Sequence, residues 1–266
     1  MRLARGPASP RFSICAMVTD WSQYTGCRDS YRSHGFDENT CEFLVLDNSA
    51  GNRADAFIAN NEFLQAARGS YVILTHQDVT LIEHGRAELE EMLERLTSLD
   101  PCWAVAGNAG FTHDGWPTLC ISHPQKDVEV LGGPFPKRVI SLDENFLVVR
   151  KMANLALSRD LSGFHHYGVD ICTIADVLGW NAYVIGFFLR HHSSGNIDAI
   201  YDRSQKAFIA KYERALRPRW VHLITWRSFY QAGNGKGVQL AQWTRFLGKV
   251  GRRIRRLGRR HSQPRA

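Results

Sequence analysis

Apolar residues along the chain gather in short runs that end in polar turns, a pattern typical of buried strands. The first run, Phe12–Val18, stops at Thr19 and Asp20, and the others end in a similar way. The predicted strands cover residues 12–18, 43–46, 71–75, 103–106, 146–149 and 182–188. Because both faces of each run are apolar, we expect these strands to lie inside a sheet that is covered on both sides.

Segments with apolar residues at intervals of three and four separate some of these runs and predict helices. In one of them, Leu89, Leu93 and Leu96 lie on one face and Glu side chains occupy the other. The predicted helices cover residues 56–67, 88–99 and 170–178. Strand, helix and strand in succession indicate a βαβ unit, so the sequence predicts an α/β fold with a mostly parallel, Rossmann-like sheet flanked by helices.

Two segments depart from this pattern. Residues 107–136 are rich in Gly, Pro, His and Asp, and predict a long loop or a small hairpin insertion of the kind that often carries function. After Trp220, a glycine-rich hinge at residues 233–237 precedes a stretch in which apolar and basic residues share a helical repeat. We therefore predict an N-terminal extension at residues 1–10, a single domain at 11–220 and a basic helical tail at 221–266.

The positive charge of the protein belongs to its C-terminal part, residues 214–266, which includes this tail. Of the 33 Lys and Arg residues, 14 follow Glu213, where Asp and Glu are absent, so residues 1–213 hold 19 basic against 26 acidic residues. Three interpretations of the tail remain open: a helix packed on the body, a helix bound peripherally to an anionic membrane, and a nucleic-acid arm. No RNA-reading motif precedes the tail, so we do not expect a nucleic-acid partner.

Other features of the composition limit the cellular setting. The six cysteines form no Cys-x-x-Cys pair, which favours free thiols in a reducing compartment over a zinc knuckle or a disulfide framework. We find neither an apolar signal segment near Met1 nor a run long enough for a transmembrane helix. We expect a cytoplasmic protein, with peripheral binding to the inner membrane face as the alternative that the tail leaves open.

Polar clusters follow the predicted strands, where open α/β sheets bind ligands. Asp47 and Asn48 come after one strand, and His76, Gln77 and Asp78 after the next. The glycine-rich loops that bind dinucleotides or phosphates are absent, so a diphosphate would need a divalent cation held by carboxylate oxygen. The segments 163–170 and 191–195 add His and Asp in glycine-flanked turns. Because the adjacent His191 and His192 point in opposite directions on an extended segment, we expect at most one of them to face a given ion.

These clusters resemble the nucleotide-sugar half of the GT-A glycosyltransferases, in the family-two-like branch whose acidic motif reads His-Gln-Asp-Val. The resemblance extends in order over residues 11–200. Its matching segments are Leu46–Ser49, Asn60–Asp78, Trp103–Gly110, Ser141–Val149, Gly163–Asp170 and His192–Gly195. The resemblance implies a GT-A-like domain that uses Mn²⁺ or Mg²⁺ and a nucleoside-diphosphate sugar.

The resemblance also implies roles for individual residues. Asp47, with Asn48, Asn61 and Gln77, corresponds to the donor-binding side, and Asp78 to the carboxylate that holds the metal and through it the diphosphate. His192 matches a late histidine that some members add to the metal. His76 replaces the first Asp of the family's acidic motif, so strict metal dependence stays open. For Asp78 the alternative is a plain loop or cap carboxylate, and for His192 a structural histidine.

The acceptor side is implied in the same way. Asp170 occupies the position of the catalytic base, although it could instead cap the helix that follows. Asp143 and Glu144 lie where acceptor-side acidic residues are found. His165, His166, Tyr167 and Trp116 are candidates to line the acceptor pocket, with a packed loop as the alternative for them.

The function that follows is an inverting, metal-assisted transfer of a sugar to a hydroxyl of a glycan or lipid-linked acceptor. The alternative is a non-catalytic nucleotide-sugar or glycan-binding module, which the incomplete acidic motif favours. A nucleotidyltransferase-like enzyme is a weaker third reading, because it would normally carry a glycine-rich loop near the first strand.

Overall fold

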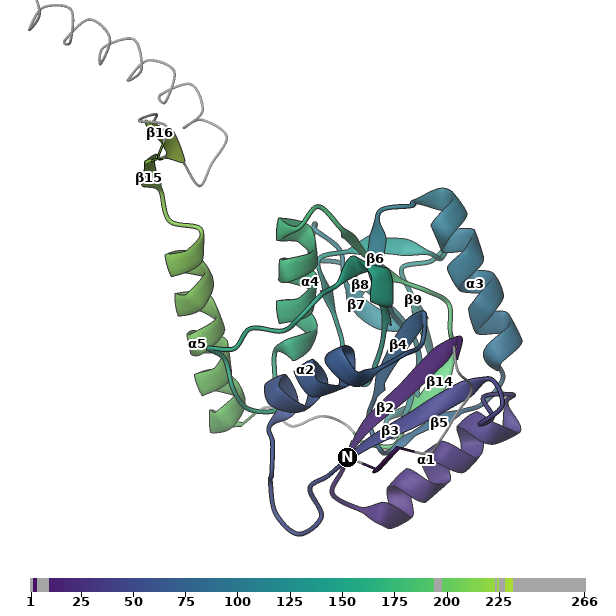
Figure 1. Ribbon diagram of the computed structural model, residues 1–266. Helices are drawn as coiled ribbons and strands as arrows, with labels where there is room; N and C mark the ends of the chain where they lie inside the picture. Colours follow the sequence, from purple (N-terminus) through teal and green to yellow (C-terminus); the bar gives the residue numbers. More distant parts are fainter. Residues whose placement is uncertain (1, 4–9, 194–197, 223, 225–227, 232–266) are drawn as a thin grey trace, which may run out of the picture. The chain divides into compact units, whose positions relative to one another are not determined.

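A mixed β-sheet with helices on both faces forms the core of the larger unit of the chain (Figure 1). The computed structural model describes residues 2–3, 10–193, 198–222, 224 and 228–231. The chain divides into two units, residues 1–208 and 209–266. The domain boundaries predicted after residues 10 and 220 stay predictions.

The central sheet contains the strands that the apolar runs predict. Its order within the described residues is β1 (Arg2–Leu3), β3 (Cys41–Asp47), β2 (Phe12–Val18), β4 (Tyr71–Thr75), β12 (Phe146–Arg150), β6 (Trp103–Gly107), β13 (Asn181–Val184) and β10 (Lys137–Val139). The pairs β3–β2, β2–β4 and β6–β13 are parallel. Strand β12 runs antiparallel to both β4 and β6, so the sheet is less parallel than predicted. The chain reaches β12 from the inserted strands and not through a crossover helix, and this permits the reversal.

Alternation along each strand divides the core into two layers. In β4, Val72 and Leu74 face the layer that α2 (Ala56–Ala66) and α4 (Tyr167–Val177) cover. Tyr71 and Ile73 face the layer of α1 (Trp21–Ser33) and α3 (Arg86–Leu99). The predicted α/β fold is confirmed, and helices α2, α3 and α4 begin and end close to their predicted limits.

The 107–136 segment forms a hairpin insertion, the second of its two predicted alternatives. Its strands belong to a smaller sheet with the order β11 (Ser141–Leu142), β7 (Ala109–Phe111), β8 (Pro117–His123), β14 (Leu189–His191) and β5 (Val79–Leu81), and β9 (Lys126–Leu131) pairs with β8. The predicted strand 182–188 ends at Val184, and the chain then crosses to this second sheet as β14. A short 3₁₀ turn, Lys151–Ala153, follows β12.

The C-terminal part is described only in pieces. Helix α5 (Ala199–Ala215) is followed by an antiparallel pair, β15 (Arg219–His222) and β16 (Ser228–Gln231). Most of the predicted basic helical tail lies at residues 232–266, outside the described residues.

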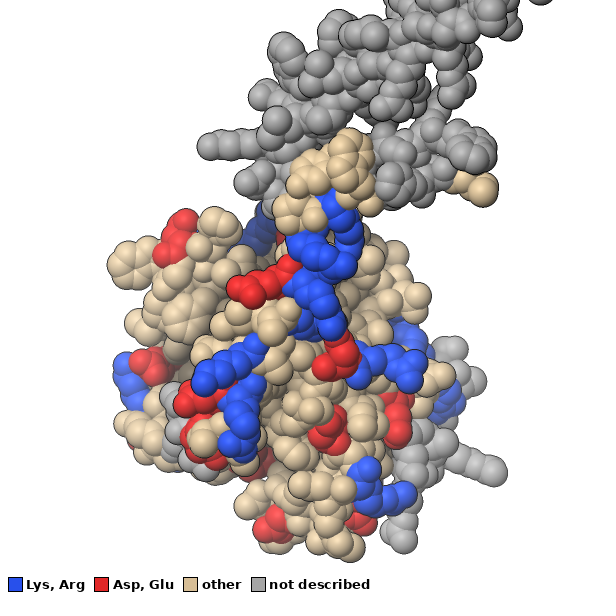
Figure 2. Space-filling view, turned by 90° about the vertical axis from the view of Figure 1, so that its left-hand side faces the viewer, with Lys and Arg blue, Asp and Glu red and all other residues tan. Residues whose placement is uncertain are grey.

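Figure 2 shows Lys and Arg interspersed with Asp and Glu over the described part of one face, so no field of a single sign covers that face. Among the described helices, none is both long and apolar enough to span a membrane.

Candidate functional site

The side chains of His76, Asp78 and His191 converge at the carboxyl end of β4. His76 and Asp78 lie in the turn that carries the chain from β4 to β5, and His191 is the last residue of β14. The backbone of His76 is fixed on both sides, because its N–H donates to the carbonyl of Asn145 at 3.0 Å and its carbonyl accepts from the Cys27 thiol at 3.6 Å. The positions of these side chains are therefore set by the two sheets.

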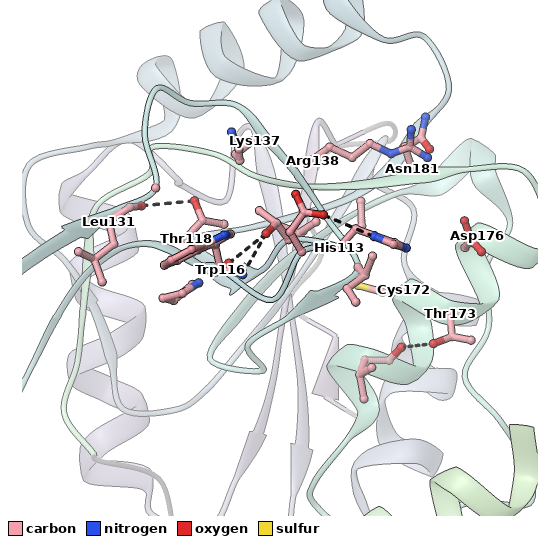
Figure 3. Close-up of a pocket in the computed structure, with 18 of the residues that line it drawn as sticks. His113, Trp116, Thr118, Leu131, Lys137, Arg138, Cys172, Thr173, Asp176 and Asn181 are labelled. Carbon is pink, nitrogen blue, oxygen red and sulfur yellow. Dashed lines mark hydrogen bonds and ion pairs between the residues drawn. The ribbon is translucent and has the colours of Figure 1, made fainter.

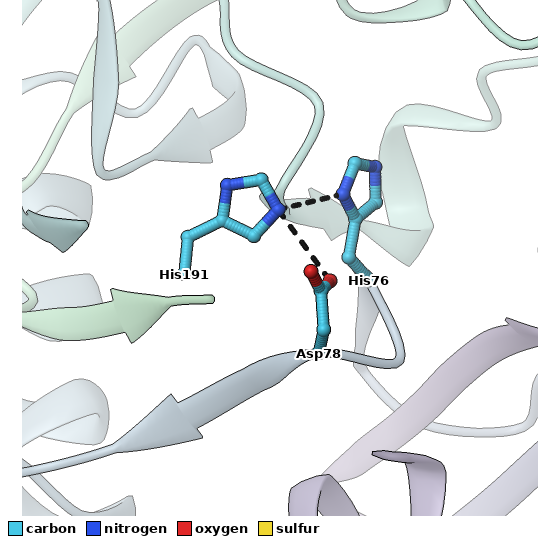
Figure 4. Close-up of side chains that lie close together, drawn as sticks. All are labelled: His76, Asp78 and His191. Carbon is cyan, nitrogen blue, oxygen red and sulfur yellow. Dashed lines mark hydrogen bonds and ion pairs between the residues drawn. The ribbon is translucent and has the colours of Figure 1, made fainter. Parts of the chain in front are cut away.

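The ligand atoms of this cluster lie close together (Figure 4). His76 Nδ1 is 3.2 Å from His191 Nε2, and that nitrogen is 3.4 Å from Asp78 Oδ1. One atom from each residue lies within 4.8 Å of the other two. Metal bonds of about 2.1 Å place neighbouring ligand atoms roughly 3.0–3.4 Å apart, so the observed spacing fits a single cation.

Electrostatics favour the protonation states that metal binding requires. Burial by itself raises the pKa of Asp78, but the hydrogen bond and charge of His191, with His76 and Ser193, outweigh burial and lower that pKa to about 2. Burial lowers the pKa of His76, and the neighbouring His191 lowers it further. At neutral pH the cluster therefore offers an ionised carboxylate beside a neutral imidazole.

The candidate cluster contains His191 and not His192, the histidine that the sequence predicts for the metal. His192 is exposed, its Nε2 lies 2.9 Å from the Thr80 hydroxyl, and it is not among the side chains of the cluster. Of the two adjacent histidines, His191 and not His192 belongs to the cluster, and the role of either histidine at a metal stays a prediction. His76, which the sequence comparison treats as a departure from the acidic motif, is itself one of the converging side chains.

Two predicted donor-side residues lie at the same edge of the sheet. Asp47 ends β3, two strands from β4, and is partly exposed; hydrogen bonds from the Ser49 hydroxyl and N–H lower its pKa. Gln77 bridges to the loop after β2, where its carbonyl accepts the N–H groups of Thr19 and Asp20 at 2.8 and 3.0 Å. Asp47 has a carboxylate that a ligand can reach, whereas Gln77 organises the neighbouring loop.

The side chains of the two predicted donor-side asparagines, Asn48 and Asn61, form hydrogen bonds with backbone groups. Buried Asn48 accepts from Arg53 N–H and donates to the Ala54 carbonyl, which closes the turn before α2. Asn61 makes a two-sided pair with Leu157, accepting its N–H at 2.7 Å and donating to its carbonyl at 3.1 Å. Both side chains thus hold neighbouring loops in place.

The predicted acceptor-side residues divide into two groups. Tyr167 and Glu144 adjoin the cluster, because the Tyr167 hydroxyl lies 3.0 Å from both His76 Nε2 and the Glu144 carbonyl. The Glu144 carboxylate accepts the Gly168 N–H at 3.1 Å, at the start of α4. Burial, with the Asp143 charge added and the helix N–H groups opposing, raises the pKa of Glu144 to about 8.

The remaining acceptor-side residues make other contacts. Asp143 is exposed and accepts from the backbone N–H of Asn145 at 2.9 Å. His165 and His166 face the start of α5: their rings lie 5.4 and 4.4 Å from that of Tyr201, and His166 Nδ1 is 3.1 Å from the Ser204 hydroxyl. These histidines therefore join α4 to α5, as the packed-loop alternative expects.

Asp170 is poorly placed for the predicted role of catalytic base. It is 0% exposed, and its two carboxylate oxygens accept the Ser158 N–H at 2.8 Å and the Ser158 hydroxyl at 2.7 Å. A general base must come within hydrogen-bond reach of the acceptor hydroxyl. Its oxygens already hold the Ser158 segment against α4, and these contacts favour the structural alternative, while the role of Asp170 as catalytic base stays a prediction.

A cavity of about 1050 Å³ lies between the inserted strands and α4 (Figure 3). Trp116 and Leu131 line it from the insertion, Lys137 from β10, and Cys172 and Asp176 from α4. The side chains of His76, Asp78 and His191 are not among its lining residues. Of the predicted acceptor-side residues, only Trp116 contributes to this cavity.

Comparison with known proteins gives one relative in sequence and two matching solved structures. No family model matches the chain. A Pyrobaculum calidifontis mannosyltransferase, solved with GDP-Man and Mn²⁺, matches with a TM-score of 0.50 and 12% identity over 79% of this chain and 66% of that one. GalNAc-T7, solved with UDP, GalNAc and Mn²⁺, matches with a TM-score of 0.49 and 10% identity over 70% of this chain and 44% of that one.

This chain thus spans less than two thirds of either solved structure. The likeness to the mannosyltransferase shows a GT-A type of fold, as predicted. In sequence, the chain is 36% identical over 224 residues to a Fuscovulum blasticum protein named ATP synthase subunits region ORF 6, which covers 81% of this chain and 89% of that protein. The chain therefore belongs to the same protein family as ATP synthase subunits region ORF 6 of Fuscovulum blasticum.

Proposed function

We propose that this protein is a metal-assisted, inverting glycosyltransferase of the family-two-like branch, which moves a sugar from a nucleoside diphosphate to a hydroxyl of a glycan or lipid-linked acceptor. The observation that carries the proposal is the His76, Asp78 and His191 cluster at the carboxyl end of a central strand in a GT-A type of fold. The similar mannosyltransferase, whose complex contains GDP-Man and Mn²⁺, supports the same chemistry.

The donor set favours Mn²⁺ over Mg²⁺. Mg²⁺ prefers oxygen ligands and keeps several waters, whereas imidazole nitrogen binds later first-row metals more strongly. Two imidazoles and one carboxylate thus suit Mn²⁺ better. When bound there, the cation neutralises the charge that develops on the departing diphosphate. Asp47, at the same edge of the sheet, is the carboxylate that we assign to the nucleoside.

Glu144 replaces Asp170 as the base in this proposal. It adjoins the cluster through Tyr167, and its raised pKa of about 8 lies near working pH, as general acid–base catalysis favours. The Glu144 carboxylate takes the proton of the acceptor hydroxyl while that oxygen attacks the anomeric carbon. The bond from this carbon to the diphosphate oxygen breaks, and the nucleoside diphosphate leaves with the electron pair.

The test measures release of nucleoside diphosphate from a panel of nucleotide sugars with Mn²⁺, Mg²⁺ or EDTA. We expect release that Mn²⁺ supports best and that EDTA abolishes. Asp78→Asn should lose it, and the matched variant His192→Ala, which removes an imidazole outside the cluster, should keep it. Glu144→Gln should reduce transfer to an acceptor more than it reduces donor binding.

Calorimetry of donor binding separates the alternatives. A donor that binds without release, even with a crude acceptor extract, would favour the non-catalytic binding module. Failure of every donor to bind would contradict the donor site itself. Release that is equal in Asp78→Asn and wild type would contradict the role of the cluster.

A further inference from the structure

The hydroxyl of Tyr167 joins the metal cluster to the backbone. Tyr167 is the first residue of α4, and its ring is buried and packs edge-on against Phe57 at 6.5 Å. Its oxygen lies 3.0 Å from the Glu144 carbonyl and 3.0 Å from His76 Nε2. The hydroxyl is thus held from both sides in a buried position.

Counting protons assigns the direction of both hydrogen bonds. A phenol has one proton, and a carbonyl oxygen can only accept, so the Tyr167 proton goes to the Glu144 carbonyl. The Tyr167 oxygen can then only accept from His76. The ring nitrogen Nε2 of His76 must therefore carry a hydrogen.

The other nitrogen of His76 faces the cluster. A neutral imidazole has one N–H and one lone pair, so a hydrogen on Nε2 leaves the lone pair on Nδ1. Nδ1 is the atom that lies 3.2 Å from His191 Nε2, within the group that also includes Asp78. Figure 4 shows this nitrogen directed toward His191. One ring nitrogen of His76 thus donates to Tyr167, while the other directs its lone pair toward the cluster.

We propose that Tyr167 is a positioning residue that holds His76 as the Nε2–H tautomer and so presents Nδ1 to the metal. The inference rests on the metal centre of the proposed function and adds to it a residue that touches no metal. Partners of this kind typically contribute 10–100-fold to metal affinity, because they fix both the tautomer and the orientation of the ring.

The first experiment reads the tautomer without metal. Long-range ¹H–¹⁵N correlation spectra of the full-length protein distinguish a protonated ring nitrogen from one with a lone pair, and His76 is assigned by the signals that His76→Gln loses. We expect Nε2–H in the wild type and a loss of this single state in Tyr167→Phe, which removes only the hydroxyl. A wild-type His76 with its hydrogen on Nδ1 would overturn the inference.

The second experiment titrates Mn²⁺ by calorimetry. We expect the Kd of Tyr167→Phe to rise about 10–100-fold. Tyr183→Phe is the matched control, because it also removes one hydrogen-bonded hydroxyl. That hydroxyl donates to Asp100 at 2.9 Å and not to a residue of the cluster. The Kd of Tyr183→Phe for Mn²⁺ should therefore equal that of the wild type. Equal Kd values for all three proteins would overturn the role of Tyr167.

The two readouts separate this inference from the proposed function. A wild-type protein with Nε2–H at His76 that binds no Mn²⁺ would overturn the metal centre, and the positioning role with it. Wild-type Mn²⁺ binding combined with an unchanged His76 tautomer and Kd in Tyr167→Phe would overturn the positioning role and leave the metal centre standing.

Discussion

Replacing Glu144 by Gln should stabilise the protein increasingly as pH rises. Burial raises the pKa of this carboxyl group to about 8, whereas an unfolded chain has a Glu pKa of about 4.3. Between these values the folded protein keeps a proton that the unfolded chain releases. Stability is therefore highest below the unfolded pKa and falls as pH rises toward 8. Gln keeps an oxygen for the Gly168 N–H but removes this titration.

The magnitude follows from the width of that interval. A slope of about 1.36 kcal/mol per pH unit, integrated from pH 5 to pH 8, gives roughly 3.5 kcal/mol for a carboxyl group with these two pKa values. Glu144 is only partly buried, and halving this figure for solvent screening leaves about 2 kcal/mol. The free energy of unfolding of the variant, measured relative to that of the wild type, should therefore rise by about 2 kcal/mol between pH 5 and pH 8.

The assay is urea unfolding, followed by circular dichroism at each pH from 5 to 8. Glu62→Gln is the control, because it removes the same charge at an exposed position of α2. Its free energy of unfolding, plotted against pH, should stay parallel to that of the wild type. Curves for Glu144→Gln that also stay parallel to the wild type would refute the reasoning, because they would mean that the carboxyl group titrates alike in both states. If Glu144 is the base, the stabilised variant also loses transferase activity, as expected where a site is strained for function.

Three further predictions test individual positions. Asp170→Asn should lower the free energy of unfolding by about 2 kcal/mol, since it weakens the charge-assisted bonds to Ser158, yet leave the kcat of the folded fraction unchanged; a selective loss of kcat would restore its role as base. His191→Ala should abolish Mn²⁺ binding in calorimetry and His192→Ala should not, and the reverse result would contradict the cluster. Gly168→Ala places a Cβ 2.3 Å from the Leu142 carbonyl oxygen, so thermal denaturation should show a loss of roughly 1–3 kcal/mol; an unchanged Tm would show that α4 can shift freely.

The sequence predicts the central sheet well, because buried strands are visible as apolar runs. It misses α1, whose composition is polar and whose buried residues, Tyr24, Cys27 and Tyr31, are few. The available signal is Asp20, which caps this helix by accepting the N–H groups of Ser22 and Gln23. The antiparallel direction of β12 could not be predicted, since an apolar run has no direction of its own.

Site residues are predicted best where the sequence fixes them locally. His76, Gln77 and Asp78 follow a buried strand, so their place at the edge of the sheet needs no tertiary information. The proposed choice of Glu144 over Asp170 as base does need it, because both carboxylates adjoin polar backbone and only their burial differs. The sequence does not distinguish a carboxylate that binds another segment of the chain from one that is available to a substrate.

The pair His191 and His192 shows how the core determines a polar site. Adjacent residues of a strand point to opposite faces, and a shift of one residue in register would exchange them. In β14, Leu189 pairs with Leu81 of β5, and both side chains are buried in the apolar core. His191 lies two residues beyond Leu189 and therefore on the same face, next to the turn that holds Asp78.

A slip in register would move Leu189 from the core to the face of Arg190, whose partner is the exposed Asp127. Exposing a buried leucine costs roughly 1.5–3 kcal/mol, which is enough to exclude the alternative register. The apolar contact of Leu189 thus selects His191 for the cluster, although neither leucine touches a metal. The same side chain decides which of two chemically identical residues joins the cluster, and this selection depends on the pairing of strands that are separated by more than a hundred residues in the chain.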